Sequence, residues 1–253
     1  MSSKNKNRPY PIATLENVFH QKIDDAFGIV SDTHFGSKYI ALRELEEMYD
    51  RIDEAGIRQV YHAGDLTDGW MIYKGQIMDQ NRIGYEEQSK FTRDKYPYKK
   101  NMTTFIVMGN HDANYMKLQG ADIVKYVCSY RPDLKYVGMY YARFKDPEDR
   151  IKLDLVHPTG TIPYAISYGT QKYLRNRPPS YHSNILVSGH RHQSWYGYYQ
   201  EVHSFEAGCF TEPTDFLIRQ GCAGNVGGWL VEMERDGGFI KKMRTELINF
   251  KKR

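Results

Sequence analysis

Five short motifs give this chain a set of side chains that could bind metal ions. They offer carboxylates, imidazoles and one amide oxygen, which are the donors that hard-to-borderline divalent metals take from proteins. Any one motif is weak evidence, whereas five in one chain, each after an apolar run, indicate a single site. In chain order they are Asp32-Thr33-His34, Gly64-Asp65-Leu66-Thr67-Asp68, Gly109-Asn110-His111-Asp112, a single His157, and Gly189-His190-Arg191-His192.

Hydrophobic patterning predicts the elements that must position these motifs. Apolar residues at helical spacing predict a helix from about Lys38 to Ala55, and Gly56 stands where a helix C-cap is expected. Ligands of α/β sheets bind beyond the carboxyl ends of strands, so strands that end at the motifs would support the metal site. Short apolar or alternating runs predict such strands at residues 27–31, 58–62, 104–108, 151–156 and 184–188.

The later part of the chain has a stronger β pattern. Residues 195–210 are rich in Tyr, Phe and Val, and apolar runs at 229–234 and 239–240 flank an Asp236-Gly237 step typical of a hairpin turn. We expect these strands to form a second sheet stacked on the first. The stretch from Trp70 to Asn101 is predicted to be helical, with Pro97 ending the helix.

Length and composition bound the kind of protein. A chain of 253 residues can form one large domain, so we expect an N-terminal arm at 1–25 and a single domain at 26–253. No apolar stretch approaches the roughly 20 residues of a membrane span, and the polar, basic start does not resemble a secretory signal. The three cysteines are too sparse for a disulfide framework, which favours the cytoplasm.

The distribution of charge bears on the partner. The net charge of +4 is mild, but basic residues cluster at 4–8, 90–100, 172–177 and 241–253. Such clusters suit a polyanionic partner, and the alternative is ordinary solvated surface. The 21 tyrosines could stack on nucleic-acid bases, although tyrosines also fill the cores of β-sandwiches. The sequence does not indicate an oligomeric state.

The order D-x-H, G-D-x-x-D, G-N-H-[DE], H and G-H-x-H resembles the calcineurin-like metallophosphoesterase superfamily. The spacing is most similar to its short, single-domain members from bacteria and phages, of the phosphodiesterase or repair-exonuclease-like type. The resemblance spans about residues 27 to 229. It implies an α/β fold of two stacked mixed β-sheets flanked by helices, a four-layer sandwich, in a bacterial cell or a phage-infected host.

The resemblance also implies two divalent metal ions and their ligands. Manganese is the expected metal, and iron, zinc, cobalt, nickel and magnesium are the alternatives. Two histidines one residue apart point the same way on an extended backbone, so both ends of the last motif could face the metals. The implied ligands are Asp32, His34 and His192 for one ion, Asn110, His157 and His190 for the other, and Asp65 for both.

Three further residues receive roles from the resemblance. His111 would act as the general acid or electrostatic stabiliser at the leaving oxygen, and Asp112 would orient it. Asp68 would hold a ligand or His111 in place. Between the two histidines of the last motif, Arg191 is expected to point away from the metals.

The expected function is metal-dependent hydrolysis of phosphoesters through a metal-bridging hydroxide. Gly69 and Trp70 follow Asp68, where phosphoprotein phosphatases of the superfamily have Arg-Gly, so this chain departs from the Ser/Thr phosphatase branch. A phosphodiesterase acting on DNA, RNA or nucleotides is the leading hypothesis. The alternatives are a phosphomonoesterase or nucleotide pyrophosphatase, and a non-catalytic scaffold.

Overall fold

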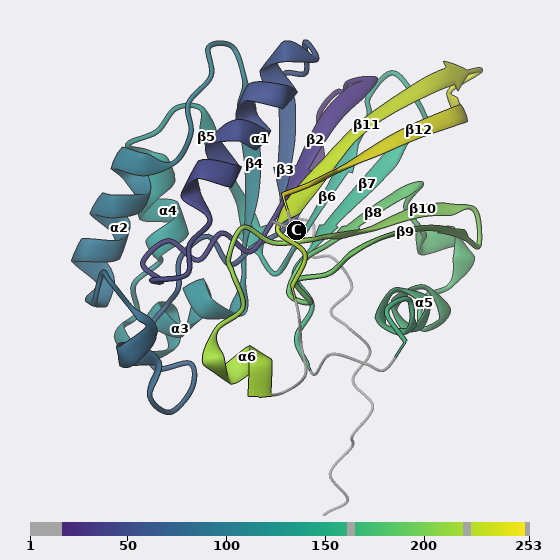
Figure 1. The fold of residues 1–253 in the computed structure, drawn as a ribbon. Coiled ribbons are helices and arrows are strands. Elements are labelled where there is room, and N and C mark those ends of the chain that lie inside the picture. Colours follow the sequence, from purple (N-terminus) through teal and green to yellow (C-terminus); the bar gives the residue numbers. More distant parts are fainter. Residues whose placement is uncertain (1–16, 161–164, 220–223, 251–253) are drawn as a thin grey trace, which may run out of the picture.

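The computed structural model describes residues 17–160, 165–219 and 224–250, and two six-stranded sheets form its centre (Figure 1). The first sheet has the strand order β12-β11-β2-β3-β4-β5. Its strands are β2 (Ala26–Val30), β3 (Gln59–His62), β4 (Thr103–Met108), β5 (Leu134–Met139), β11 (Gly227–Asp236) and β12 (Phe239–Asn249).

The second sheet has the order β1-β6-β7-β8-β10-β9. Both sheets are mixed, because β2 to β5 run parallel while β11 is antiparallel to β2, and β7 is parallel to β8 but antiparallel to β6. The strands of this sheet are β1 (Val18–His20), β6 (Tyr141–Lys145), β7 (Lys152–Val156), β8 (Ile185–Ser188), β9 (Ser194–Tyr199) and β10 (Val202–Ala207).

Aromatic side chains fill the space between the two sheets. The ring of Tyr61 from β3 stacks on Phe105 from β4 at 5.6 Å and meets Phe144 from β6 edge-on at 5.1 Å, centroid to centroid. All three side chains are buried, with Tyr61 and Phe144 fully so. Rings of this size supply much of the apolar area that a core removes from water, so this contact joins the sheets.

Helices cover the outer faces of the sheets (Figure 1). Helix α1 buries Leu45, Met48, Tyr49 and Ile52, an apolar stripe at helical spacing that packs on the first sheet. The predicted four-layer α/β sandwich is confirmed. The helices are α1 (Leu42–Glu54), η2 (Gln76–Asp79), α2 (Gly84–Lys95), α3 (Asn110–Gln119) and α4 (Ile123–Ser129) beside the first sheet, α5 (Tyr168–Arg175) on the second sheet, and the short η3 (Pro179–Tyr181) and α6 (Asp215–Arg219).

The placement of the later strands differs from the expectation. β9 and β10 belong to the second sheet, as predicted, but the hairpin β11–β12 extends the first sheet through the pairing of β11 with β2. The prediction that the hairpin belongs to a second sheet was therefore wrong. Alternation identifies a strand, but a strand's neighbour is decided by contacts distant in sequence.

The stretch from Trp70 to Asn101 is only partly helical. It contains η2 and then α2, which ends at Lys95, before Pro97 as predicted. Gly75 and Gly84 have φ values of 91° and 86° at the starts of these two elements. This left-handed backbone favours glycine and interrupts the longer helix expected from composition.

The structure describes only part of the expected N-terminal arm. Residues 1–16 of the expected arm (1–25) lie outside the described residues, while Val18–His20 forms β1 beside β6. In the part of the chain that is described, no helix combines the length and apolar character needed to cross a membrane.

Candidate metal centre

The carboxyl ends of five strands deliver the motifs to one place. β2, β3 and β4 of the first sheet and β7 and β8 of the second each end one to three residues before a candidate ligand. The loops after β2 and β3 are joined by backbone hydrogen bonds, from Asp32 N to Gly64 O at 2.9 Å and from His34 N to Asp65 O at 3.1 Å. The site therefore lies on backbone that both sheets hold in place.

Several of the candidate ligands have an unusual backbone conformation. A non-glycine residue with positive φ is uncommon, and strained backbone of this kind clusters at functional sites. Five candidate ligands have a positive φ: Asp32 (51°), His34 (47°), Asp65 (51°), His190 (76°) and His192 (55°). The extended backbone expected at the last motif, which holds His190 and His192, was therefore wrong.

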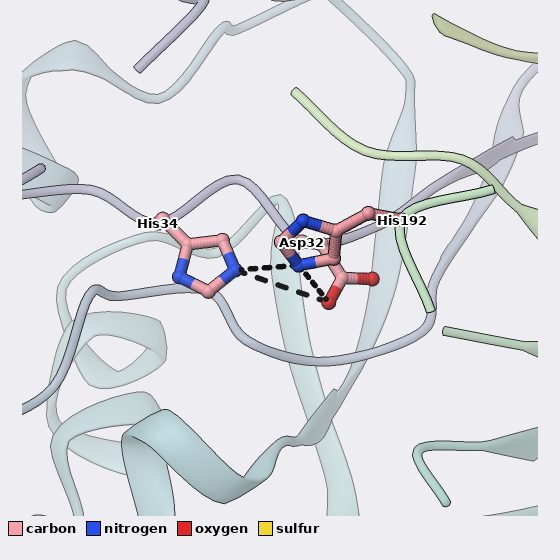
Figure 2. A group of neighbouring side chains, drawn as sticks. All are labelled: Asp32, His34 and His192. Atoms are coloured by element: carbon pink, nitrogen blue, oxygen red, sulfur yellow. Dashed lines mark hydrogen bonds and ion pairs between the residues drawn. The ribbon is translucent and has the colours of Figure 1, made fainter. Parts of the chain in front are cut away.

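One group of candidate ligands gathers around Asp32 (Figure 2). Asp32 Oδ1 lies 3.3 Å from His192 Nε2 and 3.9 Å from His34 Nε2. The two imidazole Nε2 atoms are 3.1 Å apart. The other carboxylate oxygen, Oδ2, accepts hydrogen bonds from Ser31 Oγ at 2.5 Å and from His190 N at 3.0 Å. Oδ1 and the two ring nitrogens are thus turned toward one another.

A second group gathers around His157. Its Nε2 lies 3.0 Å from Asn110 Oδ1 and 3.3 Å from Asp65 Oδ2, and its Nδ1 is 2.7 Å from the carbonyl of Ala63. The Ala63 carbonyl can only accept, so His157 Nδ1 carries the hydrogen and Nε2 is left for the site. The ring of His190 completes this group with Asp65 and His157.

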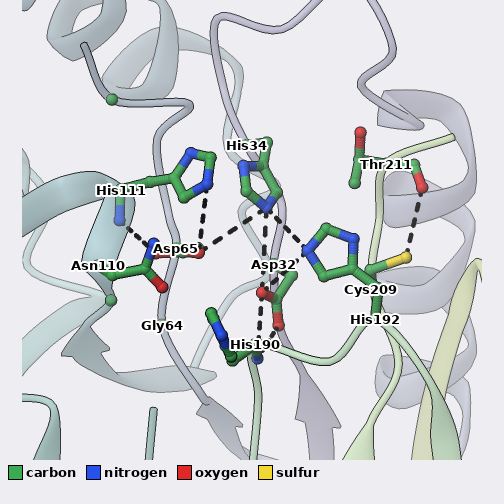
Figure 3. Close-up of polar contacts among 12 residues, drawn as sticks. Asp32, His34, Gly64, Asp65, Asn110, His111, His190, His192, Cys209 and Thr211 are labelled. Atoms are coloured by element: carbon green, nitrogen blue, oxygen red, sulfur yellow. Dashed lines mark hydrogen bonds and ion pairs between the residues drawn. The ribbon is translucent and has the colours of Figure 1, made fainter. Parts of the chain in front are cut away.

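Asp65 lies between the two groups (Figure 3). Its Oδ2 is 3.3 Å from His157 Nε2 and 4.0 Å from His34 Nε2. Its Oδ1 accepts a hydrogen bond of 2.8 Å from the backbone N–H of His111. One buried carboxylate therefore faces ring nitrogens from both groups.

His111 stands beside Asp65 at the start of α3. Its Nε2 is 4.0 Å from Asp65 Oδ2, and its Nδ1 is 2.7 Å from the backbone carbonyl of Asp68. The carboxylate of Asp68 also approaches a ligand, with Oδ1 3.5 Å from His34 Nδ1. Asp68 therefore contacts both His34 and His111, and its role in holding them in place stays a prediction.

Asp112 does not contact the His111 ring, which corrects the expected role. One of its oxygens accepts hydrogen bonds from the backbone N–H of Gly109 at 3.1 Å and of Leu66 at 3.0 Å. The other accepts from the backbone N–H and hydroxyl of Thr67 at 2.8 and 2.7 Å. This side chain caps the start of α3 and ties it to the loop after β3.

Burial and neighbouring charges set the protonation of the site. Burial acts to raise the pKa of Asp65, but His157 and His111 outweigh it and hold that pKa well below the usual range. Burial acts to lower the pKa of His157, yet the carboxylate of Asp65 raises it to about 9. For His190, burial and then the charge of His157 lower the pKa to about 4. The carboxylates thus favour positive charge at the centre of the site.

The donor set fits divalent metal ions. Asp32 and Asp65 are at most 1% exposed, and buried carboxylates are stable only when paired or bound to cations. Two imidazole Nε2 atoms 3.1 Å apart, as in His34 and His192, need a proton or a cation between them. Mixed nitrogen and oxygen donors suit manganese, iron, zinc and cobalt.

Arg191 points away from the site, as expected. Its guanidinium Nη1 lies 2.5 Å from Glu206 Oε1 and 3.3 Å from Ser188 Oγ, and both partners are buried in the second sheet. This ion pair anchors the turn that carries His190 and His192.

Sequence reasoning missed the partners that surround the candidate ligands. Ser31, next to Asp32, was not singled out, although its hydroxyl contacts that carboxylate. Three glutamines, Gln76, Gln80 and Gln88, are buried around Asp68 and Gly69. No sequence motif marks them, and the only signal was the unusual length of the stretch between the second and third motifs.

Comparison with known proteins identifies the protein family of this chain. A model of the calcineurin-like phosphoesterase family matches residues 26–205, and the chain belongs to that family. The DNA polymerase II small subunit of Methanocaldococcus jannaschii is 26% identical over 251 residues, an alignment that covers 79% of this chain and 41% of the subunit. The chain thus spans about two fifths of the length of this relative.

Solved structures with a similar fold include a phosphodiesterase and a sorting protein. An archaeal phosphodiesterase is 11% identical, with a TM-score of 0.47, and the match covers 88% of this chain and 99% of that one. Zinc-bound Vps29 from Entamoeba histolytica is 15% identical, with a TM-score of 0.47, covering 89% of this chain and 99% of that one. These similarities concern the fold alone.

Proposed function

We propose that the chain is a binuclear-metal-dependent phosphoester hydrolase that cleaves phosphodiesters of nucleic acids or nucleotides. The observation that carries the proposal is the position of Asp65, whose Oδ2 is 3.3 Å from His157 Nε2 and 4.0 Å from His34 Nε2. A carboxylate between two groups of donors suits a bridge between two cations. Membership of the calcineurin-like phosphoesterase family supports the type of reaction.

The proposed ligands divide between two ions. Manganese is our first choice of metal, with iron, zinc, cobalt, nickel and magnesium as alternatives, because mixed nitrogen and oxygen donors do not select one of them. When bound, two such ions lower the pKa of water to give a nucleophile near neutral pH and offset the charge of the phosphoryl oxygens. We assign Asp32, His34 and His192 to one ion, Asn110, His157 and His190 to the other, and Asp65 to both.

The remaining chemistry belongs to His111. Its Nδ1 is 2.7 Å from the carbonyl of Asp68, an acceptor only, so Nδ1 carries a hydrogen and Nε2 is the atom free to transfer a proton. That Nε2 lies 4.0 Å from Asp65 Oδ2, beside the proposed bridge. In its imidazolium form, His111 would act as the general acid, donating the proton of Nε2 to the leaving oxygen while Nδ1 keeps its hydrogen toward the Asp68 carbonyl.

Two observations support nucleic acid or nucleotides as the substrate class. The relative from Methanocaldococcus jannaschii is named as a subunit of a DNA polymerase. Exposed basic residues lie on α2 (Lys90 and Lys95) and on α5 (Lys172 and Arg175). Lysine and arginine side chains on a surface favour binding to a phosphate backbone.

The substrate class is tested by hydrolysis with manganese of three compounds in parallel. These are bis(p-nitrophenyl) phosphate, p-nitrophenyl phosphate and a labelled single-stranded DNA. The proposal expects cleavage of the diester and of DNA, abolished by a chelator. Cleavage of the monoester alone would replace it with a phosphomonoesterase, and no cleavage of any compound would favour a non-catalytic scaffold.

The site is tested by two variants and a surface control. Asp65→Asn weakens the proposed bridge and is expected to abolish activity while the fold remains. His111→Gln is expected to keep both metals and to lose about 10²–10⁴-fold in rate, the usual contribution of a general acid. The control is Asp53→Asn, an exposed carboxylate paired with Arg58, which should leave the rate unchanged. Normal turnover by Asp65→Asn would refute the site.

A further inference from the structure

Three glutamine side chains are buried beside the candidate metal centre. Gln76, Gln80 and Gln88 are 2%, 4% and 0% exposed. Glutamine is mostly found on protein surfaces, and an amide taken out of water needs hydrogen-bond partners inside the protein. Gln76 lies in η2, Gln80 follows it and Gln88 lies in α2, so all three come from the stretch between the second and third motifs.

The three amides converge on two consecutive residues, Asp68 and Gly69. Gln76 Nε2 donates to the carbonyl of Asp68 at 2.7 Å and to its Oδ2 at 3.0 Å. Gln80 Nε2 donates to the same Oδ2 at 2.7 Å and to the carbonyl of Gly69 at 2.8 Å. Gln88 brackets Gly69, accepting from its N–H and donating to its carbonyl, both at 3.0 Å.

Asp68 also contacts two imidazoles, through Oδ1, which none of these glutamine hydrogen bonds engages, and through the same carbonyl that accepts from Gln76. Its Oδ1 lies 3.5 Å from His34 Nδ1, and its carbonyl lies 2.7 Å from His111 Nδ1. The two rings meet edge to face, with centroids 4.4 Å apart. Gly69 packs closely against the start of α3, where a Cβ on Gly69 would lie 2.4 Å from the carbonyl of His111. Movement of Asp68 or Gly69 would therefore move both rings.

We propose that Gln76, Gln80 and Gln88 are positioning residues that fix His34 and His111 through Asp68 and Gly69. The glutamines touch neither ring and act only through that pair of residues. Neutral amides suit this role because they hold the Asp68 carboxylate without a formal charge. A lysine or arginine there would form an ion pair with Asp68 and weaken its attraction for the imidazoles. The inference rests on the proposed function for the roles of His34 and His111.

The first test observes the rings directly and does not require activity. Gln80→Glu is nearly isosteric but places a carboxylate against Asp68 Oδ2 and the carbonyl of Gly69. In ¹⁵N-labelled protein without added metal, the Nδ1 protons of His34 and His111 should shift or disappear in this variant. Gln119→Glu, at an exposed position of α3, is the matched control and should leave both signals unchanged. Unchanged signals in Gln80→Glu would overturn the proposal.

The second test uses the leaving group to separate positioning from a general loss of structure. A p-nitrophenolate leaves without a proton, whereas the alkoxide of a dinucleotide leaves only when protonated, so the dinucleotide depends more on His111. Gln80→Glu is expected to lower kcat for the dinucleotide at least about tenfold more than for bis(p-nitrophenyl) phosphate, with similar KM values. Equal losses on the two substrates would overturn the proposal.

A further variant covers the case in which Gln80→Glu does not fold. Gln80→Met removes the two donated hydrogen bonds and adds no charge, and the same shift of the Nδ1 protons and the same change in the kcat ratio are expected. Failure of the proposed function would be seen separately, as a wild-type protein that cleaves neither diester. In that case the imidazole signals still decide whether the glutamines position His34 and His111.

Discussion

A single methyl group at Gly109 should disable the centre, although alanine fits the φ and ψ of this position. Gly109 has φ −93° and ψ −174°, a conformation open to alanine. A Cβ added there would lie 2.1 Å from Asp65 Oδ1, 2.3 Å from the backbone N of Asp65 and 2.7 Å from Asp65 Cγ. These distances are more than about 1 Å inside normal contact. The backbone of Asp65 and its carboxylate must therefore both shift, which moves the carboxylate from its place between His157 and His34.

The magnitude follows from the size of that displacement. A shift of about 1 Å in a catalytic group lowers rates about 10²-fold, while overpacking costs about 1–3 kcal/mol of stability. Gly109→Ala should thus stay folded at room temperature and lose about 10²-fold in manganese-dependent hydrolysis of bis(p-nitrophenyl) phosphate. Metal content, measured on the same samples, should fall from two ions per chain.

The control lies at the other end of the same helix. Gly120 has φ +67°, so alanine is strained there by about 1–2 kcal/mol, but no atom lies within 4 Å of the new Cβ. Gly120→Ala should lose stability and keep both the metals and the rate. If Gly109→Ala kept wild-type activity and metal content, the argument that Asp65 must occupy this position would be refuted.

Two further predictions concern stability and metal affinity. Arg235 pairs with the fully buried side chain of Asp146 at 2.9 Å, so Arg235→Ala should destabilise the fold by about 3–5 kcal/mol in urea unfolding. Arg244→Ala, whose side chain is 58% exposed, should lose less than about 1 kcal/mol, and equal losses would contradict the role of burial. The pKa of His157 is raised to about 9, and that of His192 well above its usual value: burial opposes both shifts, and Asp65 and Asp32 outweigh it. A His157 ring with a pKa of about 9 is protonated near neutral pH, so manganese must displace its proton, and the affinity for manganese should rise roughly tenfold per pH unit from about pH 6 to pH 8. Calorimetry that found no proton release and a flat affinity would contradict this.

Local sequence was sufficient for α1, for the strands that precede the motifs and for the candidate ligands that meet at the site. The spacing of Leu45, Met48, Tyr49 and Ile52 predicted α1, because a buried helix face repeats every 3.6 residues whatever lies opposite it. The strands before the motifs were predicted for a similar reason. α3 was not predicted, since its first turn carries polar motif residues and few apolar ones mark its buried face.

The predicted ligands also come together, because parallel strands bring their carboxyl ends to one edge of a sheet. Asp32 and His192, 160 residues apart in sequence, illustrate this with a contact of 3.3 Å. The residue types alone determine which side-chain atoms can bind a metal, so the candidate metal-binding residues were predicted from the sequence. Their assignment to particular metal ions stays a prediction.

Only the tertiary structure decided what depends on contacts distant in sequence. The pattern of the β11–β12 hairpin does not reveal that it joins β2, because pairing depends on the partner as much as on the strand. Asp112 looked like the partner of its neighbour His111, yet its oxygens are taken by backbone groups of the loop after β3. The glutamines around Asp68 had no motif at all. The hydrogen-bond partners of a glutamine amide are fixed only when folding removes water and leaves one set of donors and acceptors beside it.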